Sequence, residues 1–590
     1  MKPTRPIQPV NPTDSPANYW TAVPDHLRCE VLDAKSLCEV IEYRARRQPD
    51  DLFCTLIERR QEQTLTFGQL HEGVRLAAAA LRGLGLETGD RVALMLPTGI
   101  DFLLVFFGAQ RAGMVPAAIA PPFMPRKMDF YIKDKRELLG GIGAAALVVT
   151  PNRLETGTAI QDGLPGLRHV ITPDQLQRPD TDPAPDETID CGQIAPDQIA
   201  MIQFSSGSNG RQKGVALTHA NLVNNIRAVH YAMGTTPKDV VVTWLPLYHD
   251  MGLLGCVCQA LYAGCELALM PPTLFIASPM TWLRVMYEKK GTIGVAPNFG
   301  YQLCVDRITD PDPGQFDLSR WRMALNGSEM VTVETIDGFV ERFGPLGFRR
   351  QTFMPVYGLA EATVAVCFMP PDTGARIDRI HRRRLEHDGI AEPCDDPSAS
   401  SSFVSVGKPI PGVEVRLAGR DGQPLGDRVQ GRLLVRAPSV MAGYFGDADR
   451  SERTLADGWL DTGDLAYTAD GYVYVTGRSK DVIIKAGRNY VPEHFEQAAA
   501  SVPGIRKNCV AAFGLHTAGR GTEEIVVMAE TKIRDGEELD QLSRAVKRAV
   551  SERLELTPDT VCLVPPRTIP KTTSGKVQRP LCRQIYLKTR

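Results

Sequence analysis

Short apolar runs alternate with longer amphipathic segments along the first part of the chain. The run RVALML at 91–96 precedes DFLLVFFGAQRAG, and VPAAIA precedes a segment of helical spacing near 133–139 and the run AAALVVT at 144–150. Strands that are apolar throughout are buried on both faces, which is typical of parallel sheets covered by helices. The pattern predicts an α/β subdomain built on a parallel sheet.

A second series of the same kind follows. Its predicted strands are AMIQF, VVVTWL, ELALM, TIGVAP and WRMAL, and its predicted helices are the segment after Thr218 and SPMTWLRVMYEKKG. The connection between the two series, residues 178–196, is rich in proline and aspartate and is expected on the surface. The two series together predict two α/β subdomains, each with a parallel sheet.

The pattern changes at Phe403 to short strands separated by glycine turns, which predicts a small β-barrel-like subdomain over about 403–477. After Arg478, two apolar strands and one long helix predict a compact α+β unit. The buried face of that helix is predicted from residues that recur at helical spacing: Leu539, Leu542, Val546, Val550 and Leu554. We expect a large N-terminal domain over 1–477 and a small, mobile C-terminal domain over 478–590.

Composition and charge argue against several function classes. The 590 residues include 67 Lys plus Arg and 69 Asp plus Glu, so no net field attracts nucleic acid. The most apolar stretch, 251–270, contains Gln259 and Glu266, which favours a buried helix and strand over a membrane span. The first 20 residues lack the apolar core of a signal peptide. Thirteen cysteines without zinc spacing predict reduced thiols and a cytoplasmic protein.

The stretch QFSSGSNGRQKGVALTHANL, residues 203–222, has the ingredients of a phosphate site. It is not a Walker A loop, because Gln212 stands where that motif needs its second glycine. Small residues still allow backbone N–H groups to turn toward an anion, and serine hydroxyls and Lys213 add donors and charge. Taken alone, the stretch is equally well explained as a surface turn that ends at a helix cap.

Five further motifs follow it in order: NGSE, VYGLAEAT, GWLDTGDLA, GRSKDVIIKAGRN and PKTTSGKVQR. The whole set resembles the adenylate-forming superfamily of acyl-CoA synthetases, peptide-synthetase adenylation domains and luciferases, and the likeness runs from about Ser36 to the C-terminus. WLPLYHDMGLLG, YGLAEAT and the extra segment at about 370–402 look most like the fatty acyl-AMP ligases. The first motif departs from the usual superfamily pattern at Ser205, Asn209 and Gln212.

The resemblance implies nucleotide contacts for residues in these motifs. The residues concerned are Ser205, Ser206, Gly207, Ser208, Asn209, Gly210 and Lys213 for the phosphates of ATP, Asn326, Gly327, Tyr357, Gly358, Leu359 and Ala360 for adenine, and Asp464 and Arg478 for the ribose. A carboxylate suits two adjacent hydroxyl donors. Without the other motifs, Asp464 is equally readable as a turn residue and Tyr357 as a core aromatic.

The resemblance also implies catalytic roles. Glu361 would hold Mg²⁺, and Lys576 would carry an ammonium to the carboxylate and α-phosphate during adenylation. Lys480 would be the hinge about which the C-terminal domain turns. His249 would gate the acyl channel or contact the adenylate, although a histidine paired with Asp250 explains it nearly as well.

These expectations lead to one function and two alternatives. The fatty acyl-AMP ligases use ATP and Mg²⁺ to turn a fatty acid into its adenylate and pass the acyl group to the phosphopantetheine of an acyl carrier protein. The segment at 370–402 is expected to be an ordered insertion that restricts access of coenzyme A, with its arginines on a solvated face. The alternatives are an acyl-CoA synthetase and a catalytically weak acyl-adenylate binder.

Overall fold

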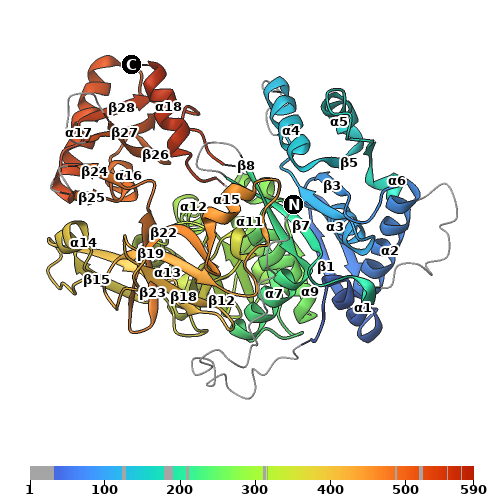
Figure 1. Cartoon of the computed structure of the whole chain (residues 1–590). Helices are drawn as coiled ribbons and strands as arrows, with labels where there is room; N and C mark the ends of the chain where they lie inside the picture. The colour runs from blue at the N-terminus through green and yellow to red at the C-terminus, as the bar shows by residue number, and fades with distance from the viewer. Residues whose placement is uncertain are drawn as a thin grey trace.

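The computed structural model describes residues 32–122, 128–177, 191–206, 212–309, 312, 314, 316–485, 488–516, 523–554, 556–572 and 575–589. Within them lie two large mixed sheets covered by helices, a curled antiparallel sheet and a small C-terminal sheet. This confirms the predicted α/β architecture. Figure 1 shows the C-terminal elements, coloured red, stacked on one end of the molecule above α14 and β15.

The first large sheet has seven strands in the order β20-β8-β7-β4-β3-β5-β6. These strands are β3 (Arg91–Met95), β4 (Val115–Ala118), β5 (Ala144–Val149), β6 (His169–Ile171), β7 (Ile199–Ser206), β8 (Gln212–Thr218) and β20 (Gly443–Tyr444). The five from β7 to β6 are parallel, whereas β8 and β20 are antiparallel additions at one edge. The predicted parallel sheet is therefore present, with two antiparallel strands added at one edge.

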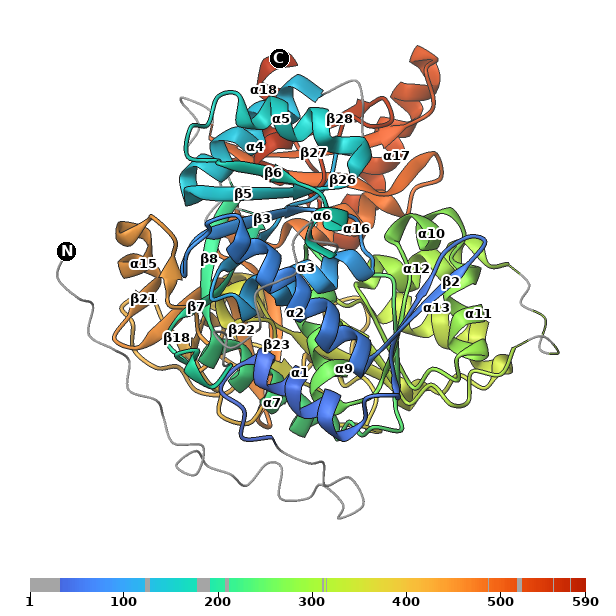
Figure 2. The same ribbon diagram turned by 90° about the vertical axis from the view of Figure 1, so that its right-hand side faces the viewer.

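Helices lie on both sides of this sheet. They are α2 (Phe67–Gly83), α3 (Ile100–Arg111), α4 (Met128–Ile142), α5 (Leu154–Gln161) and α6 (Pro173–Gln177). Figure 2 views the molecule from the side of α2 and α3, which pack against each other beside α1 (Leu37–Arg47). Ten consecutive residues of α3 are buried, which explains why its sequence is apolar all round.

The second large sheet has nine strands in the order β17-β14-β13-β12-β11-β9-β10-β1-β2. They are β1 (Leu52–Ile57), β2 (Glu62–Thr66), β9 (Val240–Thr243), β10 (Glu266–Leu269), β11 (Ile293–Ala296), β12 (Met323–Asn326), β13 (Phe353–Tyr357), β14 (Cys367–Phe368) and β17 (Lys408–Pro409). Its helices include α7 (His219–Met233), α11 (Met280–Glu288), α12 (Asn298–Arg307) and α13 (Val333–Phe343). Its central strands are parallel, so their carboxyl ends carry residues to one edge.

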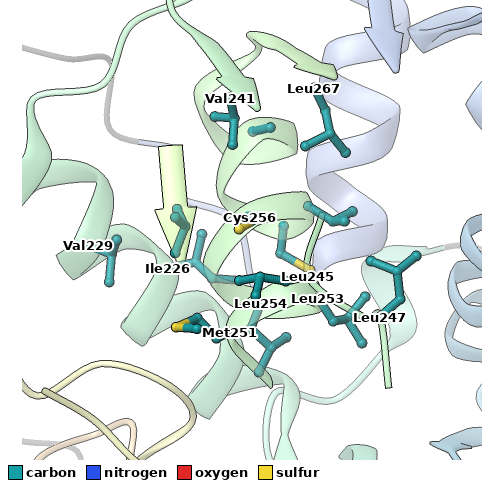
Figure 3. Packing of buried hydrophobic residues seen from close by; sticks show 14 of the residues in the cluster. Ile226, Val229, Val241, Leu245, Leu247, Met251, Leu253, Leu254, Cys256 and Leu267 are labelled. Carbon is teal, nitrogen blue, oxygen red and sulfur yellow. The ribbon is translucent and has the colours of Figure 1, made fainter. Parts of the chain in front are cut away.

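One continuous hydrophobic core joins the two large sheets. Figure 3 shows part of it, where Met251, Leu253, Leu254 and Cys256 pack near Ile226 and Val229 of α7. Met251 belongs to α8 (Asp250–Gly252), and Leu253, Leu254 and Cys256 belong to the π-helical turn η6 (Leu253–Cys258). The helix α9 (Gln259–Ala263) continues from this turn. The apolar stretch at 251–270 is thus a buried helix followed by strand β10, as predicted.

The antiparallel sheet has the order β18-β19-β22-β21, and β23 pairs with β22. Its strands are β18 (Glu414–Ala418), β19 (Gly431–Arg436), β21 (Leu455–Ala456), β22 (Trp459–Ala469) and β23 (Tyr472–Arg478), and α15 (Ala448–Thr454) lies beside it. The extra segment forms β15 (Ile377–His381), α14 (Arg382–Asp388) and β16 (Ser400–Val404). Its Ile380 and Leu385 pack in a cluster with Tyr467 and Tyr474, so this segment is ordered, as predicted.

The C-terminal sheet consists of β26 (Ile505–His516), β27 (Glu523–Thr531) and β28 (Thr560–Val564), with α16 (Pro492–Ala500), α17 (Gly536–Leu554) and α18 (Arg579–Thr589) around it and the hairpin β24 (Ile483–Lys485) and β25 (Arg488–Tyr490) before it. It has its own core. Four of the five predicted residues of α17 are buried, whereas Leu539, in the first turn, is only partly covered.

A buried arginine ties this C-terminal unit together. Arg579 donates to Asp481, Glu493 and Glu496 over 3.0, 2.7 and 2.7 Å. A buried ion of this kind is stable only when its partners satisfy it, and here three carboxylates do so. The cluster links the start of α18 to α16 and to the chain that leaves β23.

Three absences hold for the described residues. No helix there is long and apolar enough to cross a membrane. No three histidine, cysteine or acidic side chains gather there as a metal site would need. All twelve cysteines within the described ranges are free, and Cys256 and Cys258 pack in the core, as their apolar surroundings predict.

Candidate active site

The predicted ribose and adenine residues lie side by side between β13 and β22. The hydroxyl of Tyr357 donates to Asp464 Oδ2 over 2.5 Å, and Arg478 Nε lies 3.1 Å from the other carboxylate oxygen. Pairing of β22 with β23 aligns Asp464 with Arg478 directly. Burial raises the pKa of Asp464, while Arg478 and Tyr357 act to lower it. Asp464 is therefore more than a turn residue, because it joins two separate elements.

The predicted purine slot consists of backbone segments that approach each other closely. A Cβ on Gly358 would lie 1.7 Å from the carbonyl oxygen of Val364, and one on Gly327 would lie 2.7 Å from that of Val356. No side chain fits at either position. Leu359 and Ala360 continue the same turn, and Ala360 begins the short 3₁₀ turn η9 (Ala360–Ala362).

Asn326 ends β12 at the same edge. Its side-chain nitrogen donates to Asn298 over 3.2 Å, but its oxygen is buried and has no hydrogen-bond partner within the described part of the chain. A buried acceptor left unpaired costs free energy, so such a group is a good candidate for contact with a ligand donor. An adenine amino group is a donor of the required kind.

The phosphate loop is described at its two ends. Ser205 ends the described part of β7, and its hydroxyl is buried and unpaired among the described residues. Pairing of β7 with β8 places Ser205 opposite Lys213. The predictions for Gly207, Ser208, Asn209 and Gly210, and for the side chain of Ser206, lie outside the described residues.

Lys213 and Glu361 meet across the site. Lys213 Nζ lies 3.6 Å from Glu361 Oε1, and the hydroxyl of Tyr444 contacts both groups. Burial lowers the pKa of Lys213, Glu361 opposes this, and the positive charges of Arg450, Lys480 and Arg478 reinforce it. The predicted hinge residue Lys480 is thus close enough to act on the phosphate-loop lysine. Four cationic side chains converge where a polyanion would need them.

Backbone strain marks the turn that carries Glu361. Thr363 has a φ of 72°, a conformation that is unfavourable for a β-branched residue. Its hydroxyl donates to the backbone oxygen of Ser439 over 2.7 Å, which helps to hold the turn. The strained turn keeps Glu361 directed toward Lys213.

Lys576 reaches this site from the C-terminal unit. The carboxylates of Asp250, Glu329 and Asp464 act to raise its pKa, but burial outweighs them and lowers it. Its backbone N–H is held by Thr572 Oγ1 over 3.0 Å. A Cβ on the preceding Gly575 would lie 3.4 Å from the ring of Phe299, so the loop contacts α12. The structure thus brings Lys576 together with residues of the large sheets.

His249 lies at the start of α8 and is paired with its neighbour. Its Nδ1 lies 2.7 Å from Asp250 Oδ1, and the backbone N–H of Met251 donates to the same carboxylate oxygen over 2.7 Å. The pKa of Asp250 is lowered, because the charges of His249 and Lys576 outweigh its burial. His249 is therefore paired with Asp250, as one of its two interpretations predicts. The charge of Lys576 acts on the same carboxylate.

Two residues near the site were missed by the sequence interpretation. Tyr444 lies in the region that the sequence predicts as short strands and glycine turns, and Glu329 is the last residue of the motif NGSE. Burial raises the pKa of Glu329, which accepts from the backbone N–H of Phe299 and is acted on by Lys576 and Lys571. The signal available for Glu329 was an acidic residue three positions after the end of strand β12.

The extra segment contacts the C-terminal unit, and one expectation about it was wrong. Arg382 was placed on a solvated face, but it is 7% exposed and its Nη1 donates to the backbone oxygen of Arg553 in α17 over 2.6 Å. Nearby, Arg553 pairs with Glu334 over 3.2 Å, and Lys507 pairs with Asp306 over 2.7 Å. Burial also lowers the pKa of His494, at this contact, to about 4. These contacts hold the unit in the orientation that brings Lys576 into the site.

Comparison with known proteins agrees with this arrangement. A family model described as AMP-binding enzyme matches residues 41–445. A Caulobacter vibrioides protein named "Putative acyl-CoA synthetase" is 33% identical, over 89% of this chain and 91% of its own length. The medium-chain-fatty-acid–acyl-carrier-protein ligase JamA of Moorena producens is 30% identical, over 94% and 95%.

A solved structure gives the same result for the fold. It comes from a study of fatty acyl-adenylate ligases from E. coli and L. pneumophila, and it superimposes with a TM-score of 0.88 at 34% identity, covering 95% of this chain and 99% of the other. The family match covers more than half of the chain. The chain therefore belongs to the AMP-binding family of adenylate-forming enzymes.

Proposed function

We propose that this enzyme activates a fatty acid with ATP to give fatty acyl-AMP and pyrophosphate. It then passes the acyl group to the phosphopantetheine thiol of a separate acyl carrier protein. The observation that carries the first step is the position of Lys576, which enters a site that already contains Asp464, Glu361 and Lys213. A partly buried ammonium at that point offsets the repulsion between a carboxylate and a triphosphate better than an exposed one.

Each bond change has a partner in the site. A carboxylate oxygen attacks the α-phosphorus, and the bond from that phosphorus to the bridging oxygen of the β-phosphate breaks, so pyrophosphate leaves. Lys576 stabilises the charge on the attacking and α-phosphate oxygens, and Lys213 stabilises the leaving pyrophosphate. Asp464 holds the ribose through its free lone pairs, and Asn326 accepts from the adenine amino group through its unpaired oxygen.

Glu361 is the residue that would hold Mg²⁺. Its Oε1 lies 3.6 Å from Lys213 Nζ beside the phosphate loop, and carboxylate oxygens are ligands that Mg²⁺ takes together with substrate phosphates and water. Magnesium supplies charge neutralisation on the phosphate oxygens when it is bound. Glu361 itself would keep the ion at the mouth of the phosphate loop.

The choice of acid and acceptor rests on the relatives. JamA is named for a fatty acid and an acyl carrier protein, and the FadD26 protein of Mycobacterium marinum, 31% identical over 94% of this chain, is named a long-chain-fatty-acid–AMP ligase. The thiol attacks the acyl carbonyl carbon, the C–O bond to AMP breaks, and the thiol proton leaves to solvent. The Caulobacter relative supports a second candidate, in which coenzyme A is the acceptor.

The test is a screen of short- to long-chain fatty acids for exchange of labelled pyrophosphate into ATP. Products are then identified by mass spectrometry with carrier protein, with coenzyme A, or with neither. Acid-dependent exchange and carrier loading support the proposal. Exchange with faster formation of acyl-CoA than of acyl-carrier would establish the second candidate. Absence of exchange with every acid would replace both with an acyl-adenylate binder.

A further inference from the structure

Tyr444 lies between the two charged groups that face each other across the site. Its hydroxyl donates to Glu361 Oε1 over 2.9 Å and accepts from Lys213 Nζ over 3.2 Å. The same ammonium lies 4.9 Å from the centre of the Tyr444 ring. We propose that Tyr444 is a positioning residue for adenylation, which holds Glu361 and Lys213 apart so that one can bind the metal ion and the other the phosphates. This inference rests on the proposed function of the site.

The fold fixes Tyr444 through its backbone as well as its side chain. Strand β20 pairs with β8, the strand of Lys213, with Tyr444 opposite Val215. On either side, Met441 N–H donates to the backbone oxygen of Glu361 and Phe445 N–H donates to that of Gly214. The segment therefore connects the strand of Lys213 to the turn of Glu361, and the Tyr444 hydroxyl completes the connection.

A tyrosine hydroxyl is well suited to this position. Without it, the ammonium of Lys213 would close on the carboxylate of Glu361, since the two are already 3.6 Å apart and partly shielded from water. A direct ion pair would compete with a divalent cation for Glu361 and draw Lys213 away from the phosphates. A neutral O–H donor occupies one carboxylate oxygen without adding positive charge beside the ion.

The test compares Tyr444→Phe with a matched control, Tyr467→Phe. Tyr467 is also buried, and its hydroxyl donates to a carboxylate, Asp378 Oδ2, over 3.0 Å. It packs in the hydrophobic cluster that contains Ile380 and Leu385 of the extra segment. Both variants lose one hydroxyl that is bonded to a charged group, and each keeps its ring. The measurements are the Mg²⁺ concentration for half-maximal pyrophosphate exchange, the KM for ATP, the KM for the acid, and the thermal midpoint.

For Tyr444→Phe we expect the half-saturating Mg²⁺ concentration and the KM for ATP to rise about three- to tenfold, the range for the net contribution of one typical hydrogen bond. The KM for the acid should stay within twofold. Tyr467→Phe should lower the thermal midpoint without changing any of these constants. A Tyr444→Phe enzyme with wild-type Mg²⁺ and ATP dependence would overturn the inference, and so would equal shifts in the two variants. Absence of exchange in the wild-type enzyme would instead overturn the proposed function.

Discussion

The ammonium of Lys576 is the residue-scale feature on which the chemistry depends. It is partly buried in the site, and the carboxylates of Asp250, Glu329 and Asp464 act on it. We expect Lys576→Ala to lower adenylation by about 10²- to 10³-fold, the effect of removing one preorganised transition-state donor. Transfer from supplied acyl-AMP to a carrier thiol should persist, because no bond to the α-phosphorus forms or breaks in that step. Single-turnover assays of the two half-reactions separate them, and near-normal adenylation would contradict the mechanism.

The same residue should set the alkaline limit of the reaction. Burial lowers its pKa below the ordinary lysine value of 10.5. Only the protonated form stabilises the transition state, so adenylation should fall as pH rises through that lowered pKa. Arginine stays protonated at any accessible pH, so Lys576→Arg, though slower, should lose this fall. A pH profile of pyrophosphate exchange provides the test, and identical alkaline limbs in the two enzymes would assign the titration to another group.

At the scale of elements, we propose that the junction after β23, where Lys480 lies, sets how the C-terminal unit is placed. Proline fixes φ and removes a backbone donor, so Lys480→Pro should slow rotation and make acyl-AMP accumulate while transfer to the thiol lags. The structure adds a necessary control, because the charge of Lys480 also acts on Lys213. Lys480→Ala removes that charge and leaves the backbone free. Equal effects of alanine and proline on the two half-reactions would show that charge, and not rotation, is responsible.

The contact between α14 and α17 is a second feature that we expect to affect how the C-terminal unit is placed. Deleting the whole insertion would also remove Ile380 and Leu385 from a hydrophobic cluster, so a point change is the sharper experiment. We expect Arg382→Ala to leave adenylation within about threefold and to raise acyl-CoA formation relative to carrier loading by about two- to tenfold. Arg379→Ala removes an exposed charge from the same insertion and should change neither. An unaltered product ratio in Arg382→Ala would separate the insertion from acceptor choice.

Across the whole molecule, sequence predicted what is local and missed what depends on distant pairing. Alternating apolar runs predicted the α/β layers, and ordered motifs placed Asn326, Tyr357, Asp464 and Lys576 in one candidate site. Tyr444 could not be found in this way, because its contact with Lys213 joins positions 231 residues apart through the pairing of β20 with β8. Likewise Arg382 meets a backbone oxygen 171 residues away, which no charge pattern along the chain reveals.

The Arg579 cluster has a consequence for timing. Arg579 stands three residues after Lys576, and it is bonded both to α16 and to Asp481, the residue directly after Lys480. Arg579 thereby joins the loop of Lys576 to the junction, so we expect a change of backbone conformation at the junction to displace the ammonium. In the proposed mechanism, the acyl-adenylate forms while Lys576 is in the site. Lys576 leaves the site for transfer to the thiol, so the same molecule cannot activate a second acid during that step.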